Sequence, residues 1–154
     1  MKIQSQKPKG FDEHIFQMSW SFSPEIAQEI WNNLQRREFF IKGQFPLYKV
    51  EFDSPNDSGP FEFGELNIHH GPLLSLHGSI GEINSNYRDL IYFYGSYILS
   101  FRLIRPTRLE FFKQENTISV KITTFIRPMI KPFWNLGLKV FWKIFANAIT
   151  LKNL

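Results

Sequence analysis

The chain has 154 residues, a length typical of one domain that can bury a core of its own. It contains no cysteine, which excludes disulfides, thiolate catalysis and cysteine-ligated zinc and is typical of a reducing compartment. The formal net charge is +4, but lysine and arginine are scattered along the chain, so we expect no nucleic-acid binding. No apolar run has the length of a secretory leader or a membrane span, which predicts a cytoplasmic protein. Residues 1–10 predict a flexible tail, and residues 11–154 predict a single domain.

The first elements are a strand and a helix. Apolar and polar residues alternate over 16–22, which predicts a strand with one buried face. Ser23 suits a helix N-cap and Pro24 suits the first helical position. We expect this helix to end at Arg36 and Arg37, whose charge suits a helix C-terminus. Its apolar residues recur at helical spacing and predict one buried stripe: Ile26, Ile30, Trp31 and Leu34.

Strands and turns succeed one another after this helix, so we expect an antiparallel meander of about six strands. A change of parity at Gly64 predicts a bulge. The run over 88–104 is too long for one strand at about 3.3 Å per residue and should break or bend at Gly95 and Ser96. Residues 105–107 predict a turn. The alternating segments are 48–52, 61–68, 74–80, 88–104, 108–111 and 118–123.

The last stretch, 132–154, predicts a long helix with a narrow polar stripe. Its polar residues are spaced by fours and a three: Asn135, Lys139, Lys143, Asn147 and Thr150. Apolar residues cover well over half of the circumference, so this helix needs a concave partner. A twisted antiparallel sheet of seven strands curls and supplies one. We expect four residues on one side of the helix to face this sheet: Trp134, Leu138, Phe141 and Phe145.

Catalytic chemistry is poorly supported by the sequence. Adjacent His69 and His70 would point to opposite faces of a strand, so we expect half-exposed histidines and no metal site. Strand parity places His77 outside the apolar face, together with Arg108 and Glu110. No catalytic residue is assigned and no cofactor is expected. The other groups considered as metal ligands or as acids and bases are Glu65, Glu82 and Asp89.

Ligand binding is better supported, because the chain contains 17 phenylalanines, 4 tryptophans and 5 tyrosines. Such aromatic surface either fills a core or lines a cavity. Tyrosine hydroxyls in an apolar space are the kind of polar group that orients a small molecule. We therefore predict ligand-binding positions at the four tyrosines of the meander and at the four helix residues named above. The tyrosines are Tyr48, Tyr92, Tyr94 and Tyr97.

The order of elements resembles that of the START-like superfamily, also called SRPBCC. The likeness runs from about residue 16 to residue 154, and the stretches 87–90 and 105–109 are similar in character to this superfamily. The resemblance implies an α+β helix-grip fold, in which a curved seven-stranded antiparallel sheet wraps round the long C-terminal helix. The second small helix of such folds would have to be compressed into about 37–42 or be absent.

The resemblance also implies a function. A hydrophobic or aromatic small molecule, lipid-like or polyketide-like, would bind between the sheet and the C-terminal helix. A polyketide cyclase or dehydrase is the alternative, with one acid/base residue in the same cavity. Transient contact of the helix with a membrane is a third hypothesis, since lysines accompany its aromatic residues. The sequence does not determine the oligomeric state.

Overall fold

The computed structural model describes residues 6–71, 75–95 and 102–150, with the side chains of 93–95 excepted. The described strands form one seven-stranded antiparallel sheet in the order β1-β7-β6-β5-β4-β3-β2. The strands are β1 (Asp12–Ser21), β2 (Lys49–Phe52), β3 (Leu66–His70), β4 (Ser75–Ile83), β5 (Tyr87–Gly95), β6 (Ile104–Gln114) and β7 (Thr117–Ile126). The helices are α1 (Pro24–Leu34), α2 (Arg37–Gln44), the short 3-10 helix η1 (Pro128–Ile130) and α4 (Lys131–Thr150).

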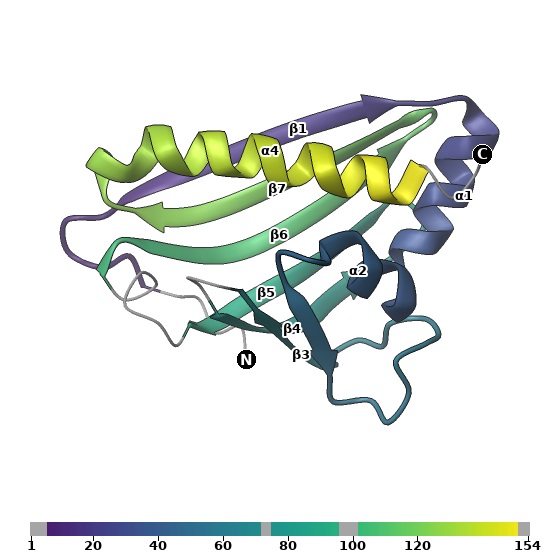
Figure 1. Cartoon of the computed structure of the whole chain (residues 1–154), viewed down its shortest axis with the longest axis horizontal. Helices are drawn as coiled ribbons and strands as arrows, with labels where there is room; N and C mark the ends of the chain where they lie inside the picture. The colour runs from purple at the N-terminus through teal and green to yellow at the C-terminus, as the bar shows by residue number, and fades with distance from the viewer. Residues whose placement is uncertain (1–5, 72–74, 96–101, 151–154) are drawn as a thin grey trace.

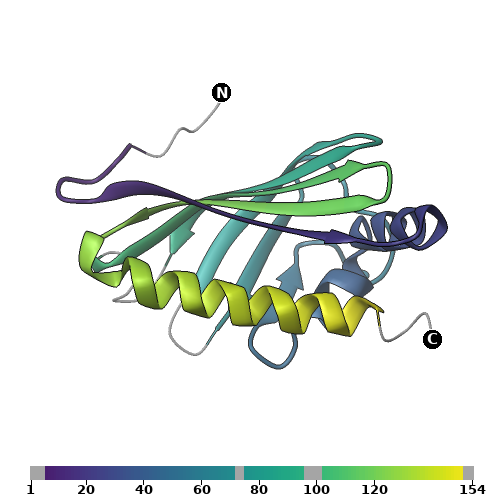
Figure 2. The ribbon, with the colours of Figure 1, turned by 90° about the horizontal axis from the view of Figure 1, so that it is seen from above.

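The long helix α4 lies along one face of this sheet (Figure 1). In the turned view the sheet curves over α4, and α1 and α2 lie near one end of the helix (Figure 2). The core forms where the inner face of the sheet meets α4, with Leu109, Phe111 and Val120 among its buried residues. This arrangement is the helix-grip fold, so the predicted fold class is confirmed.

The strand β1 and the helix α1 form as predicted, with a buried strand face and a capped helix start. Phe16 is buried on the inner face of β1. The hydroxyl of Ser23 accepts a hydrogen bond from the amide of Ile26 at 3.4 Å, and Pro24 occupies the first turn of α1. The predicted apolar stripe is wrong at one position, because Ile26 is exposed and Ala27 is buried in its place. Ala27 lies three residues before the buried Ile30, so it shares the covered side of the helix.

Helix α2 is the compressed second helix that the resemblance implies. The predicted end of the first helix is wrong, because α1 ends at Leu34 and Arg37 opens α2. The side chain of Arg37 is buried against Glu65 rather than solvated. Near the other end of α2, a Cβ on Gly43 would clash with the buried ring of Phe145. The missing side chain therefore allows α2 to approach α4 closely.

The segment that leads into β3 differs from the prediction. Residues 61–65 form no strand, and Gly64 lies in a turn with φ +84° instead of a strand bulge. The two faces of β3 are also reversed. Asn67 and His69 are buried, whereas Leu66 is exposed. The apolar alternation was misleading here because a side chain of α2 provides a polar partner on the inner side.

The expectations for β5 and β6 are tested only in part. β5 is described as far as Gly95, and the residues that follow the expected break lie outside the described part of the chain. The predicted strand over 97–103 falls largely outside the described residues, and its last two positions are not in a strand. The predicted turn at 105–107 is wrong, because β6 runs through it. The sheet accommodates Pro106 because the register of β6 on β7 shifts between Pro106 and Arg108.

One side of α4 faces the sheet. Leu138 and Phe145 are buried, and the half-buried Trp134 and Phe141 pack against the core, so the four residues expected to face the sheet lie on the covered side of α4, where Phe145 packs against α2. Trp142 joins them and is buried. The expectation that the sheet would cover the whole apolar arc is wrong, because α4 rests on one surface and leaves its other side open. Its exposed apolar residues are Phe133, Leu136, Val140 and Ile144.

Candidate functional site

A cavity of about 430 Å³ lies between the inner face of the sheet and α4. Pockets that hold small molecules usually have volumes of about 300 to 1,000 Å³. Most of the wall is apolar and comes from β4, β6, β7 and α4. None of the described side chains that line this cavity is charged. Six of them carry polar groups: Gln44, Tyr48, His69 and Tyr92, and Trp134 and Trp142 through their indole N–H groups.

The positions predicted to bind a ligand are only partly brought together. Five line the cavity: Tyr48, Tyr92, Trp134, Leu138 and Phe141. Phe145 is not among the lining residues and is buried in the core beside α2. The side chain of Tyr94 and the whole of Tyr97 lie outside the described residues. The sequence analysis missed Gln44, Gly137 and Trp142, which also line the cavity.

His69 lies in the cavity wall on β3 and is 2% exposed. Its Nδ1 is 2.9 Å from Oε1 of Gln44, and its Nε2 is 3.0 Å from Oδ1 of Asn67. Burial lowers the pKa of His69 from 6.5 to about 3, and the charge of His70 adds to this lowering. His69 is therefore neutral at pH 7. The prediction of half-exposed histidines is wrong for His69, whereas His70 is exposed.

A neutral imidazole carries one N–H group, so His69 donates to only one of its two amide partners. The other amide must turn its NH₂ group toward the ring. Asn67 suits this role, because its Nδ2 otherwise has no partner among the described residues. His69 then donates from Nδ1 to Gln44 and accepts at Nε2 from Asn67. This network joins the end of α2 to β3 and fixes the ring in the cavity wall.

Two tyrosines complete the polar end of the cavity. Ring centroids of Tyr48 and Tyr92 lie 6.4 and 5.7 Å from that of His69. Burial raises the pKa of both phenols, so both keep their protons at neutral pH. No described residue hydrogen-bonds either hydroxyl, so both can donate to a ligand or accept from it. Tyr48 also contacts Phe141 of α4, at 5.8 Å between ring centroids.

We predict that His69 makes the fold less stable in acid. The folded-state pKa of about 3 lies below the ordinary value of 6.5, so the unfolded chain takes up the proton first. Stability that is present above pH 6.5 is lost as the pH falls toward 3, by at most about 1.4 kcal/mol per pH unit. The groups that contact the ring are Gln44, Asn67, Phe40, Tyr48 and Tyr92, and all are uncharged in this range.

Urea unfolding at a series of pH values tests this prediction. His69→Gln keeps a side chain that can hydrogen-bond to both amides but removes the titrating ring. We expect its unfolding free energy to fall less steeply with acid than that of the wild type. His70→Gln is the control, because this exposed neighbour on the same strand should leave the slope largely unchanged. Equal slopes for the wild type and His69→Gln would contradict a buried neutral ring.

Arg88 is a buried cation that the sequence analysis did not single out as inward-facing. It is 4% exposed, and its Nε has no hydrogen-bond partner among the described residues. The guanidinium carbon lies 4.7 to 5.0 Å from the ring centroids of Phe40, Phe61 and Phe111. Burial lowers the pKa of Arg88 to about 9, which leaves it charged at neutral pH. Its shared parity with Tyr92 on β5 is the signal that indicates the inner face.

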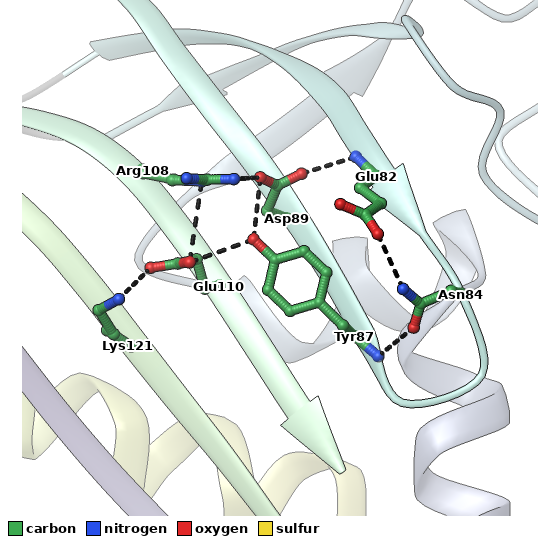
Figure 3. A network of polar contacts seen from close by, with 7 residues as sticks. All are labelled: Glu82, Asn84, Tyr87, Asp89, Arg108, Glu110 and Lys121. Atoms are coloured by element: carbon green, nitrogen blue, oxygen red, sulfur yellow. Dashed lines mark hydrogen bonds and ion pairs between the residues drawn. The ribbon is translucent and has the colours of Figure 1, made fainter.

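The outer face of the sheet carries a separate polar network (Figure 3). Nε of Arg108 donates to Oδ2 of Asp89 at 2.7 Å, and Nζ of Lys121 lies 2.8 Å from Oε2 of Glu110. The hydroxyl of Tyr87 is 3.1 Å from an oxygen of each carboxylate. Asp89, Glu110 and Lys121 are cross-strand neighbours with parity opposite to that of the cavity residues. The carboxylates of Asp89 and Glu110 are paired with Arg108 and Lys121 on the outer face, so they cannot reach the cavity.

The described parts of the chain contain neither a set of metal ligands nor a membrane-spanning helix. There, no three histidine, aspartate or glutamate side chains gather as a set of metal ligands. In the same residues, no helix combines the length and the apolar character needed to cross a membrane. The cytoplasmic location stays a prediction.

A sheet curved over one long helix, with a cavity between them, defines a helix-grip protein. No sequence family matches this chain, and no curated protein matches it in sequence. Solved structures do match it in three dimensions. Major latex-like protein 151 from Panax ginseng has a TM-score of 0.61 at 12% identity, covering 94% of this chain and 98% of its own.

Two other structures show the same similarity. Norcoclaurine synthase from Thalictrum flavum, in complex with dopamine and hydroxybenzaldehyde, has a TM-score of 0.58 at 12% identity and covers 97% of this chain and 93% of its own. Ara h 8.0201 has a TM-score of 0.54 at 11% identity and covers 90% and 99%. At identities this low, the structural similarity establishes the fold alone. The START-like resemblance is therefore confirmed for the fold.

Proposed function

We propose that this protein binds an uncharged hydrophobic or aromatic small molecule in the cavity between the sheet and α4. The observation that carries this proposal is the cavity of about 430 Å³, whose described lining contains no charged side chain. An ionised ligand buried there would lack a partner of opposite charge, which is costly in an apolar site. The hydroxyls of Tyr48 and Tyr92, which have no hydrogen-bond partner among the described residues, suit a hydroxyl or carbonyl group at one end of the ligand.

The comparisons support this proposal only through the fold. A synthase with this fold was solved with dopamine and hydroxybenzaldehyde, which are small aromatic molecules. A lipid or a polyketide is the ligand class that the START-like resemblance implies. Because one fold hosts both binding proteins and enzymes, the choice between these roles must come from the cavity itself.

A catalytic role has less support from the cavity. A general acid or base works best when its pKa lies near the working pH. The pKa of His69 is about 3, and burial raises the pKa of Tyr48 and Tyr92. These groups are suited to hydrogen bonding with a ligand and poorly suited to moving a proton at neutral pH. We therefore prefer binding to a cyclase or dehydrase reaction.

Fluorescence with N-phenyl-1-naphthylamine tests the proposal, because this probe is uncharged and aromatic and emits more strongly in apolar surroundings. Trp134 and Trp142 lie in the cavity wall, so bound probe should quench their emission by energy transfer. We expect saturable binding to the natively purified protein. We also expect denaturation of that protein to release a small molecule visible by mass spectrometry. Failure of both measurements would overturn the proposal.

A further inference from the structure

Helix α4 carries an exposed apolar side that the fold does not use. It consists of Phe133, Leu136, Val140 and Ile144, which we call the outer stripe. Phe133 is 74% exposed and Ile144, the most covered of the four, is 43% exposed. Spacings of three and four place these residues on one side of the helix. No part of the described chain covers them, and contiguous exposed apolar surface of this kind marks an interaction site.

The lysines of α4 flank the outer stripe. Lys139 and Lys143 directly precede Val140 and Ile144, about 100° round the helix axis. Both are exposed, and neither forms an ion pair with another described residue. The sequence of α4 contains no aspartate or glutamate. This side of the helix is therefore both apolar and positively charged.

The mouth of the cavity adjoins the other side of the outer stripe. Phe133 belongs to the stripe and also lines the cavity, and the exposed Leu47 lines it from the segment before β2. Phe45 and Met129 are also exposed, at 72% and 75%, and lie within two residues of lining positions. The apolar surface thus extends from α4 to the rim of the cavity.

We propose that the outer stripe docks on an anionic lipid surface, with the cavity mouth turned toward the lipid. Its apolar side chains would enter the boundary between headgroups and acyl chains, while the stems of Lys139 and Lys143 let their ammonium groups reach the headgroups. A second copy of the chain is the competing partner. The lysines favour lipid, because anionic headgroups neutralise them, whereas a second α4 would bring more positive charge. Docking does not require an occupied cavity, so this proposal goes beyond ligand binding.

Sedimentation with lipid vesicles tests the proposal on the full chain. We expect the wild type to bind vesicles of phosphatidylcholine with phosphatidylglycerol and to bind pure phosphatidylcholine more weakly. The double substitution Val140→Ser and Ile144→Ser should weaken binding about tenfold or more by removing apolar contact. The double substitution Lys139→Gln and Lys143→Gln should cost roughly 30-fold on the anionic vesicles and little on the neutral ones.

The controls separate this proposal from the others. Phe63→Ser removes an aromatic side chain that is 83% exposed but lies away from α4, and it should leave vesicle binding unchanged. Binding of N-phenyl-1-naphthylamine in solution should survive the Val140 and Ile144 substitutions, because neither residue lines the cavity. Wild-type protein that stays in solution with anionic vesicles would overturn the proposal. A dimer in light scattering that the serine substitutions dissociate, without vesicle binding, would assign the stripe to a second copy instead.

Discussion

Gly137→Trp is expected to abolish binding of N-phenyl-1-naphthylamine without lowering the stability of the fold. Gly137 lies in the middle of α4, where it lines the cavity and is also exposed, so it marks the mouth. A Cβ added there would meet no atom within 4 Å. The indole ring therefore has room to enter and would occupy the space through which a ligand passes. Glycine inside a helix is also destabilising by about 0.5 to 1 kcal/mol relative to alanine, so its replacement does not harm α4.

The measurement is a fluorescence titration together with urea unfolding of each variant. Asn147→Trp is the matched control, because it places the same side chain on the solvated polar stripe of α4, away from the cavity. We expect the control to bind the probe as the wild type does. Gly137→Ala should raise the unfolding free energy by up to about 1 kcal/mol. Undiminished probe binding by Gly137→Trp would mean that the ligand does not use this cavity.

Much of the fold can be predicted from the sequence because its elements bury one face each. The alternation that ends at Phe22 and the alternation over 118–123 correspond to β1 and β7, the two strands paired at one edge of the sheet. Ser23 and Pro24 mark the start of α1, where a helix leaves backbone N–H groups unpaired. The Ser23 side chain accepts a hydrogen bond from one of them, and Pro24 has no N–H group to leave unpaired. These signals are local, so they do not depend on which element packs against which.

The predictions are wrong where the environment of a segment depends on the distant element that packs against it. The apolar residues of β3 appear to belong inside, but Gln44 reaches His69 from α2 and makes a polar inner face stable. A proline inside β6 is tolerated because the register on β7 shifts beside it. The apolar arc of α4 suggests full burial, yet the sheet and α2 together cover only part of it. No sequence pattern specifies these contacts, because each depends on residues far away in the chain.

In the candidate site, too, local features could be predicted from the sequence, whereas features that depend on distant contacts could not. Aromatic content and tyrosine placement indicate an apolar space with hydroxyls, and Tyr48 and Tyr92 do lie at its wall. The neutral state of His69 could not be predicted, since it depends on burial between α2, β3 and two phenols. Gly137 also gave no signal, because a glycine in a helical run indicates only a weaker helix.

Breaking the buried ion pair between Arg37 and Glu65 should have the largest effect on stability. Nε of Arg37 lies 2.5 Å from Oε1 of Glu65, and Nη2 lies 3.1 Å from Oε2, so the contact is bidentate. Both side chains are buried, and the hydrogen bond to Glu65 raises the pKa of Arg37. Arg37→Met would leave the carboxylate buried without its cation. We expect a loss of about 3 to 5 kcal/mol in unfolding free energy.

Urea unfolding of a double-mutant cycle separates the pair from its surroundings. Arg37→Met with Glu65→Leu removes both charges and should be clearly more stable than Arg37→Met alone. Arg36→Met is the control, because Arg36 forms an exposed pair with Glu38 and should cost no more than about 1 kcal/mol. If Arg36→Met and Arg37→Met were equally destabilising, the buried pair would have no special role.

The same pair connects stability to the cavity. Arg37 opens α2, and Gln44 at the end of α2 holds His69 in the cavity wall. An α2 that is released from Glu65 should therefore loosen the polar end of the cavity as well as the fold. We expect Arg37→Met to weaken binding of N-phenyl-1-naphthylamine under conditions in which the protein is still folded by circular dichroism. Unchanged affinity in that folded variant would show that Gln44 keeps its position without the ion pair, and that the other contacts of α2 are sufficient to hold it.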